Sequence, residues 1–211
     1  MIQFVLVKLT NQKKGAQRME YRCEGYIPVL STPRLKLRRL ERADAEPLFE
    51  YWSDPDVVQY MNVPPFADVG ETAEMINWLN LLAETEDTIR WGIELKDSGR
   101  LIGSCGYNSW QLEGAYRAEI GYELGKSYWG QGYMHEALLA MFEFGFNVMG
   151  LNRIEALLYP VNKSSVRLLQ KLGFQREGLL RDYQRAGDRF VDLDMYSMLR
   201  REWEQRSGAN A

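Results

Sequence analysis

The chain of 211 residues contains few of the residues that build disulfide scaffolds or metal centres. Its two cysteines, Cys23 and Cys105, exclude a disulfide-rich scaffold, and we expect both to stay as thiols. One histidine and two distant cysteines do not form a metal-ligand cluster, so no metal is expected. With 18 glycines, 7 prolines and 45% hydrophobic residues, the composition also excludes collagen-like and disordered chains.

Long apolar stretches and targeting signals are missing as well. The longest apolar stretch, residues 137–151, is broken by Glu143 and Asn147. It is shorter than the about 20 residues that a membrane span needs. Residues 1–8 lack the basic start and the small-residue cleavage site of a secretion signal. We therefore expect a cytoplasmic protein that has no membrane partner.

The chain has no excess of positive charge, with 26 Lys and Arg against 29 Asp and Glu. Binding to the phosphate backbone of nucleic acids uses such an excess, so nucleic acid is not an expected partner. No repeat, low-complexity tract or linker divides the sequence. We predict one domain over residues 30–211. Residues 1–29, which include a polar turn at residues 11–15, are treated as an N-terminal appendage.

Hydrophobic periodicity predicts alternating strands and helices, and therefore an α/β fold. The expected strands are residues 34–40, 89–96, 101–110, 115–124, 153–159, 174–182 and 190–199. The expected helices are one that Asp44 caps, which carries Leu48, Phe49 and Trp52, and those over residues 71–84, 131–149 and 163–172. The turn at residues 97–100 predicts an antiparallel hairpin, and the strand-helix-strand passage over residues 119–159 predicts a parallel pair.

One predicted strand is joined to the following helix through two glycines, Gly130 and Gly132, which allow close approach of the backbone. No Ser, Thr, Asp or Asn stands at the expected helix entry, so the first N–H groups are available to an anion. A tight packing turn is the alternative interpretation. A dinucleotide-binding fingerprint needs a small residue where this chain has His135, and a phosphate loop needs a Gly-Lys-Ser/Thr sequence that does not follow.

Three segments together resemble a known family. They are Ala118-Glu119-Ile120-Gly121-Tyr122, then Tyr128-Trp129-Gly130-Gln131-Gly132-Tyr133 with Glu136-Ala137, and finally Asn162-x-x-Ser165 followed by Leu172-Gly173-Phe174. In this order they resemble the GNAT superfamily of acyl-CoA-dependent N-acyltransferases over residues 31–200, in particular its ribosomal-protein-alanine N-acetyltransferase-like branch. The resemblance implies a mixed, mostly antiparallel twisted sheet flanked by helices, with a splayed central strand pair.

The same resemblance implies acetyl-CoA as the cosubstrate. The pantetheine arm would hydrogen-bond to the backbone of residues 120–124, and the pyrophosphate would cap the helix that follows the glycine turn. The implied coenzyme-binding residues are Tyr122, Leu124, Trp129, Gly130, Gln131, Gly132, Tyr133 and Asn162. Ser127 departs from the Arg or Gln that the family often has there, which matters little if backbone groups bind the pyrophosphate.

Glu119 is the candidate general base. A primary amine with a pKa of about 10 is mostly protonated at neutral pH and must lose a proton before it attacks a thioester. A carboxylate in a covered strand, linked to the amine by water, can accept that proton, and some family members place a carboxylate here. The alternative is a solvated strand side chain, because Glu119, Gly121 and Glu123 share one strand face.

Ser165 is the candidate acid, implied by the resemblance, that reprotonates the leaving thiolate. Many family members instead carry a tyrosine seven residues after the asparagine, where this chain has Leu169. The structural alternative is that Asn162 caps the helix and Ser165 solvates its first turn. A serine, histidine and aspartate triad is not expected, since His135 has no nucleophile motif beside it and fits a surface helix position.

The function expected from these observations is direct acetyl transfer from acetyl-CoA to a primary amine. The acceptor is either the N-terminal α-amine of a protein, such as a ribosomal protein, or a small-molecule amine such as an amino acid, a polyamine or an antibiotic. A non-catalytic coenzyme A-binding module and a nucleotide-dependent oxidoreductase are the alternatives.

The oligomeric state is left open as monomer or homodimer. Six large residues are candidates for an acceptor groove, although most are expected in the core: Trp52, Tyr60, Met61, Trp78, Trp91 and Trp110.

Overall fold

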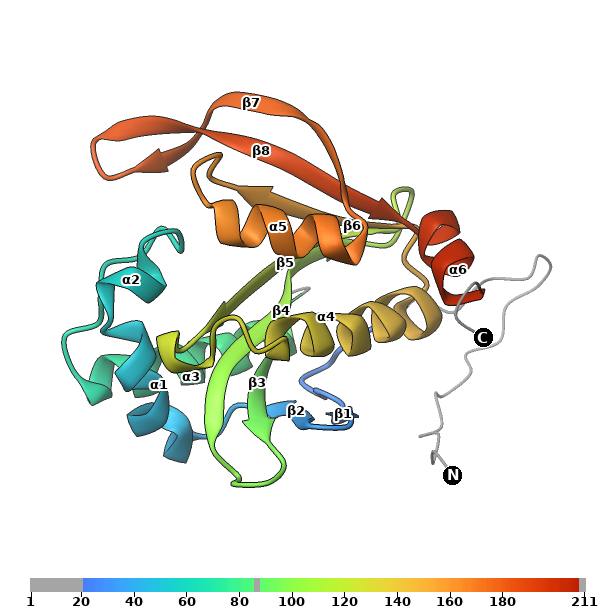
Figure 1. Cartoon of the computed structure of the whole chain (residues 1–211). Helices are drawn as coiled ribbons and strands as arrows, with labels where there is room; N and C mark the ends of the chain where they lie inside the picture. Colours follow the sequence, from blue (N-terminus) through green and yellow to red (C-terminus); the bar gives the residue numbers. More distant parts are fainter. Residues whose placement is uncertain (1–20, 86–87, 209–211) are drawn as a thin grey trace.

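The computed structural model describes residues 21–85 and 88–208 as an eight-stranded sheet with helices on both faces (Figure 1). The strands are β1 (Leu30–Ser31), β2 (Leu35–Arg39), β3 (Ile89–Leu95), β4 (Leu101–Gln111), β5 (Arg117–Leu124), β6 (Arg153–Leu158), β7 (Gln175–Ala186) and β8 (Arg189–Leu199). The helices are α1 (Ala45–Trp52), α2 (Pro55–Val58), α3 (Val69–Thr85), α4 (Tyr133–Phe144), α5 (Lys163–Leu172) and α6 (Arg200–Gly208). The predicted α/β class is confirmed, whereas β1, α2 and α6 were not predicted.

The sheet has the strand order β1-β2-β3-β4-β5-β6-β8-β7. Neighbouring strands are antiparallel except for β5 and β6, which run parallel. The predicted β3–β4 hairpin and the predicted parallel pair are therefore both confirmed. The helix α4 provides the long crossover connection that a parallel pair requires. The mostly antiparallel, mixed sheet that the sequence resemblance implied is the observed one.

Each face of the sheet has its own hydrophobic cluster. In Figure 1, α4 and α5 lie on one side of the strands and α1 and α3 on the other. The larger cluster joins α4 and α5 to the strands and includes Met141, Phe142 and Leu169. The smaller cluster joins α1 and α3 to the sheet through Leu48 and Ile76. Helices on both faces leave the central strands buried on each side, which explains their long apolar runs.

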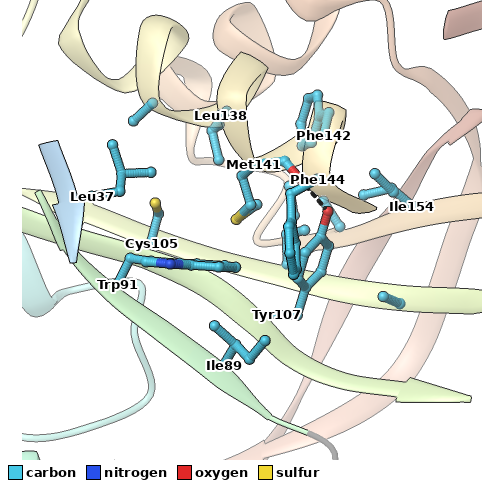
Figure 2. Packing of buried hydrophobic residues seen from close by; sticks show 14 of the residues in the cluster. Leu37, Ile89, Trp91, Cys105, Tyr107, Leu138, Met141, Phe142, Phe144 and Ile154 are labelled. Carbon is cyan, nitrogen blue, oxygen red and sulfur yellow. Dashed lines mark hydrogen bonds between the residues drawn. The ribbon is translucent and has the colours of Figure 1, made fainter. Parts of the chain in front are cut away.

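Aromatic side chains fill the space between α4 and the centre of the sheet (Figure 2). Trp91 and Tyr107 are fully buried, with ring centroids 6.3 Å apart. The Tyr107 hydroxyl donates a hydrogen bond to the Met141 carbonyl at 2.8 Å, so this buried polar group is satisfied. Cys105 lies beside them as a buried thiol, and burial raises its pKa to about 12. Neither Cys105 nor Cys23 forms a disulfide, as expected.

Residues 21–29 pack against the sheet, whereas residues 1–20 of the predicted appendage lie outside the described residues. Cys23 and Ile27 are buried in the larger cluster. The Trp91 indole N–H donates to the Pro28 carbonyl at 2.7 Å, and the Arg39 guanidinium donates to the Gly25 carbonyl at 2.7 Å. Residues 21–29 therefore contribute to the core.

Two local predictions differ from the structure. Asp44 does not cap α1 with its side chain, because its carboxylate instead binds the Arg38 guanidinium at 2.7 and 2.9 Å and the Glu41 N–H at 2.7 Å. The helix expected over residues 131–149 begins at Tyr133 and changes to a π-helical turn, Gly145–Met149. In the part of the chain that the structure describes, no helix combines the length and the apolar character needed to cross a membrane.

Gly145 lies against the Tyr107 hydroxyl, and a side chain at this position should destabilise the protein. A Cβ atom there would overlap the hydroxyl and would lie 3.0 Å from Leu151. We expect Gly145→Ala to lower the free energy of unfolding by about 1–3 kcal/mol, the usual cost of overpacking a core. Denaturant unfolding measures the change. Gly178→Ala is the matched control, since nothing lies within 4 Å of its Cβ position. Equal stabilities for the two variants would contradict this account of the core.

Candidate active site

The central strands β5 and β6 separate along their length, as the sequence resemblance implied. Their parallel ladder ends at the pair Glu119 and Glu155. Beyond this point β5 stays paired with β4 as far as Leu124, and β6 stays paired with β8 as far as Leu158. Beyond Glu119 and Glu155, the facing backbone edges of β5 and β6 are therefore not paired with each other.

A cleft of about 980 Å³ occupies the gap between the separated strands. Every residue of β5 from Glu119 to Leu124 lines it. Because successive strand residues point to opposite faces of a sheet, a cleft that contacts all of them reaches both faces. Eight of the ten predicted site residues line this cleft: Glu119, Tyr122, Leu124, Trp129, Gly130, Gly132, Asn162 and Ser165.

Gln131 and Tyr133, the other two predicted site residues, lie beside the cleft and do not line it. The exposed Gln131 side chain donates to the Ser127 carbonyl at 2.8 Å. The Tyr133 ring packs against Tyr128, with 6.4 Å between ring centroids. Both residues therefore shape the turn through their own contacts, and only their backbone groups remain candidates for coenzyme binding.

The glycine turn enters α4 without a side-chain cap, as predicted. Gly130 and Gly132 have φ values of +74° and +81°, a left-handed conformation that favours glycine. Gly132 is the N-cap residue of α4, and no side chain caps the helix there. Uncapped N–H groups and the positive end of the helix dipole favour an anionic ligand at this end of the cleft.

Arg34, which directly precedes β2, contacts the glycine turn and the first residues of α4. Its guanidinium binds the Glu136 carboxylate in α4 at 2.6 Å and donates to the Gln131 carbonyl at 3.1 Å. The same group lies 4.4 Å from the centroid of the Tyr133 ring. Thr32 also donates to Glu136 at 2.6 Å. Burial acts to raise the pKa of Glu136, but hydrogen bonds from Thr32 and Arg34 outweigh it and lower the pKa.

Helix α5 presents a row of basic side chains to the same cleft. Lys163, Arg167 and Lys171 follow one another at four-residue spacing, so they share one face of the helix. His135, in the first turn of α4, also lines the cleft and is half-buried, which corrects the expected surface position. Burial and the positive charge of Lys171 lower the pKa of His135, which favours the neutral form of its imidazole.

The opposite wall carries two carboxylates from the same face of β5, with different surroundings. Glu123 is buried, is ion-paired with Arg90, and accepts hydrogen bonds from Ser104 and, at 3.2 Å, from the Trp52 indole. Its charge is therefore already compensated. Glu119 is half-buried, lines the cleft, and accepts a hydrogen bond from the Asn108 amide at 3.3 Å. Glu119 is the β5 carboxylate without an ion pair among the described residues.

Asn162 caps α5, as the structural alternative proposed. Its side-chain oxygen accepts hydrogen bonds from the Ser165 N–H at 3.1 Å and the Ser164 hydroxyl at 2.9 Å. Asn162 and Ser165 also line the cleft, where the Ser165 hydroxyl lies beside the hydroxyl of Tyr122. The cap and a contact with a ligand are compatible, because the cap uses the oxygen of the Asn162 amide and not its NH2 group.

The large residues considered for an acceptor groove separate into two groups. Tyr60 and Met61 line the cleft, and the Tyr60 ring lies 5.8 Å from that of Tyr159, which follows β6. Those that lie outside the cleft are Trp52, Trp91 and Trp110, which are buried, and Trp78, which is exposed. In the part of the chain described by the structure, no three His, Cys, Asp or Glu side chains are placed to hold a metal ion.

The family model for the acetyltransferase (GNAT) domain matches residues 34–175 of the chain. The chain belongs to the GNAT family. The uncharacterized N-acetyltransferase p20 of Bacillus licheniformis is 46% identical over 177 residues, which are 84% of this chain and 99% of that protein. The family membership and this relative make the protein an acetyl-CoA-dependent N-acetyltransferase.

Two further proteins are similar at lower identity. The ribosomal protein uS5-alanine N-acetyltransferase of Escherichia coli is 25% identical over 183 residues, with 82% of this chain and 92% of that protein covered. The structure of Mycobacterium smegmatis RimJ in complex with CoA-disulfide has the same fold, with a TM-score of 0.76 and 22% identity. That likeness covers 84% of this chain and 90% of the RimJ chain.

Several residues of this GNAT site were missed by the sequence reasoning. Arg34 and Glu136 are 102 positions apart, and nothing local marks Arg34 as a partner of the glycine turn. The basic row on α5 had a readable signal, since Lys163, Arg167 and Lys171 follow a four-residue period. Arg90 pairs with Glu123 across two strand ladders, and that contact follows only from strand order.

Arg34 should contribute to coenzyme binding by holding the glycine turn. We expect Arg34→Ala to weaken acetyl-CoA binding about 10-fold, the size of one lost hydrogen bond to a charged group. Isothermal titration calorimetry with acetyl-CoA measures the affinity. Arg100→Ala is the control, because Arg100 forms an exposed ion pair with Glu50 outside the cleft. Unchanged affinity in Arg34→Ala would show that the turn keeps its shape without this contact.

Proposed function

We propose that the protein transfers acetyl directly from acetyl-CoA to a primary amine, without an acyl-enzyme intermediate, and that the N-terminal α-amine of a protein is its acceptor. The cleft that reaches both faces of the sheet carries this proposal. Its α4 and α5 wall is cationic, and its opposite wall bears the Glu119 carboxylate. A thioester held from one face and an amine held from the other would meet between β5 and β6.

The residues on the first wall fit the anionic coenzyme. The N–H groups at the start of α4, after Gly132, are suited to a pyrophosphate, and Lys163, Arg167 and Lys171 add positive charge along α5. The open edge of β5 is suited to the amides of an extended pantetheine arm, which would pair with it like an added strand. Acetyl-CoA supplies an activated acetyl thioester when it is bound at this wall.

The residues on the second wall fit the amine. Glu119 can accept a proton from the acceptor ammonium, directly or through one water molecule, which leaves a neutral amine that can attack the thioester. Asn108 keeps the Glu119 side chain in place through the hydrogen bond between them. Backbone N–H groups at the open edge of β5 are candidates for stabilising the oxyanion as the amine adds to the carbonyl. Holding the two reactants together would provide much of the rate.

The choice of a protein N-terminus as acceptor is supported by the Escherichia coli relative that acts on the alanine of ribosomal protein uS5.

A panel of amine acceptors tests this choice. Peptides with a free α-amine are compared with the same peptides blocked at that amine but carrying lysine, and with amino acids, polyamines and aminoglycosides. We expect mass spectrometry to find the acetyl group on the α-amine. Acetylation of small amines alone would overturn this acceptor, and coenzyme binding without any acetylation would overturn the proposed catalysis.

Glu119→Gln tests the proposed base while keeping the shape and the hydrogen bond to Asn108. At neutral pH we expect kcat/KM to fall about 100-fold, the lower range for loss of a general base. Raising the pH should restore part of the rate, since a larger fraction of the amine is then already deprotonated. Steady-state assays of coenzyme A release between pH 6 and 10 measure both effects.

The exposed Glu113 lies in the loop between β4 and β5, outside the cleft, and Glu113→Gln controls for a change in overall charge. It should keep the wild-type rate and pH profile. If Glu119→Gln also keeps the wild-type pH profile, Glu119 is not the base.

A further inference from the structure

Tyr122 carries a buried hydroxyl whose hydrogen bonding is incomplete. The side chain comes from the middle of β5 and points to the face covered by α4 and α5, the face opposite Glu119. Part of the residue is exposed to the cleft, but its hydroxyl oxygen is buried and makes no hydrogen bond of normal geometry with any described residue. Buried polar groups are nearly always satisfied, so this exception calls for a functional explanation.

The neighbour of this hydroxyl is Ser165 in the first turn of α5. Ser165 is held in place through its N–H group, which is bonded to the Asn162 cap, so its hydroxyl is available for another partner. Burial raises the pKa of Tyr122 to about 12, and the nearby Ser165 hydroxyl opposes part of that rise. Tyr122 is therefore protonated at physiological pH and can act as a hydrogen-bond donor.

Both residues line the cleft between the cationic wall and the open edge of β5, and the Tyr122 hydroxyl lies buried behind it. This is where a thioester that reaches from the α4 and α5 side toward Glu119 would place its sulfur. The next residue on the same side of α5, one turn further on, is the fully buried and apolar Leu169. Ser165 is the α5 hydroxyl suited to donate to the sulfur, because the Ser164 hydroxyl is already bonded to the Asn162 side chain. Tyr122 is the neighbouring group that can orient the Ser165 hydroxyl.

We propose that Tyr122 is a positioning residue for the leaving sulfur: its hydroxyl donates to the Ser165 oxygen and directs the Ser165 hydroxyl at the sulfur of the coenzyme. This inference rests on the proposed acetyl transfer. When the C–N bond forms and the C–S bond breaks, the electron pair of the C–S bond stays on sulfur. The proton that the amine loses balances the proton that the thiolate finally gains, so the hydroxyl pair stabilises the thiolate by hydrogen bonding alone.

Binding of coenzyme A tests the proposal without an acceptor amine. Calorimetry compares coenzyme A with desulfo-coenzyme A, which lacks the sulfur, at pH 7.5 and at pH 9.5, where more of the thiol is ionised. We expect wild-type protein to prefer coenzyme A, and to prefer it more at the higher pH. Tyr122→Phe and Ser165→Ala should each reduce that preference about 10-fold at pH 9.5. The double variant should lose no more than Ser165→Ala alone, because Tyr122 acts through Ser165.

The thermal stability of the ligand-free protein distinguishes a positioning role of Tyr122 from a purely structural one. Removing the poorly satisfied Tyr122 hydroxyl should leave the midpoint of thermal unfolding unchanged or raise it. Tyr107→Phe is the matched control, since it removes a buried tyrosine hydroxyl that is bonded to the Met141 carbonyl, and it should lower the midpoint. A loss of stability in Tyr122→Phe equal to that in Tyr107→Phe would overturn the positioning role. An unchanged preference for coenzyme A would overturn it as well.

Turnover distinguishes failure of this inference from failure of the proposed function. With an amine that the wild-type protein acetylates, Tyr122→Phe should lower kcat and leave the KM for acetyl-CoA unchanged. Normal turnover by Tyr122→Phe would overturn the inference and leave the proposed function standing. If no amine is acetylated but the sulfur preference depends on Tyr122 and Ser165, the sulfur site stands and the proposed acetyl transfer fails.

Discussion

The separation of β5 from β6 is the constraint on which the rest of the site depends. β5 stays paired with β4, and β6 stays paired with β8. Both strands therefore remain part of the sheet, although they separate from each other at one end. The ladder between β5 and β6 ends at Glu119, which places that carboxylate at the point where the gap begins. Backbone polar groups at an open edge need partners, and a ligand with amide groups can provide them. An unbroken parallel pair would leave no path between the two faces.

The net charge of −3 conceals how charge is arranged around this gap. Cationic side chains of α5 and the uncapped start of α4 lie on one wall, and carboxylates of β5 lie on the other. The two carboxylates differ because of their neighbours. Glu123 is compensated by Arg90, whereas Glu119 faces the cleft beside a neutral amide. Since a buried ion pair is costly to disrupt, Glu123 and Arg90 are suited to holding β3, β4 and β5 together, and Glu119 is suited to exchanging a proton.

Elements with a local cause could be predicted well from the sequence. Alternation of apolar and basic residues identified β2, a turn sequence with Gly99 identified the β3–β4 hairpin, and the lack of a capping residue identified the uncapped start of α4. Predictions were wrong where a contact with another element decided the outcome. Asp44 binds Arg38 of β2 instead of capping α1, and the helix after Gly132 changes to a π-helical turn where Gly145 meets Tyr107.

The sequence by itself determined the order and type of most elements, the family, and eight of the residues that line the cleft. These depend on periodicity, glycine φ angles and capping, which act over a few neighbouring residues. Only the tertiary structure decided which groups meet: Arg34 with Glu136, Glu123 with Arg90, and the hydroxyls of Tyr122 and Ser165. Such pairs come from elements far apart in the chain. Their contacts follow from strand order and from how α4 and α5 pack on the sheet, and no local pattern encodes these.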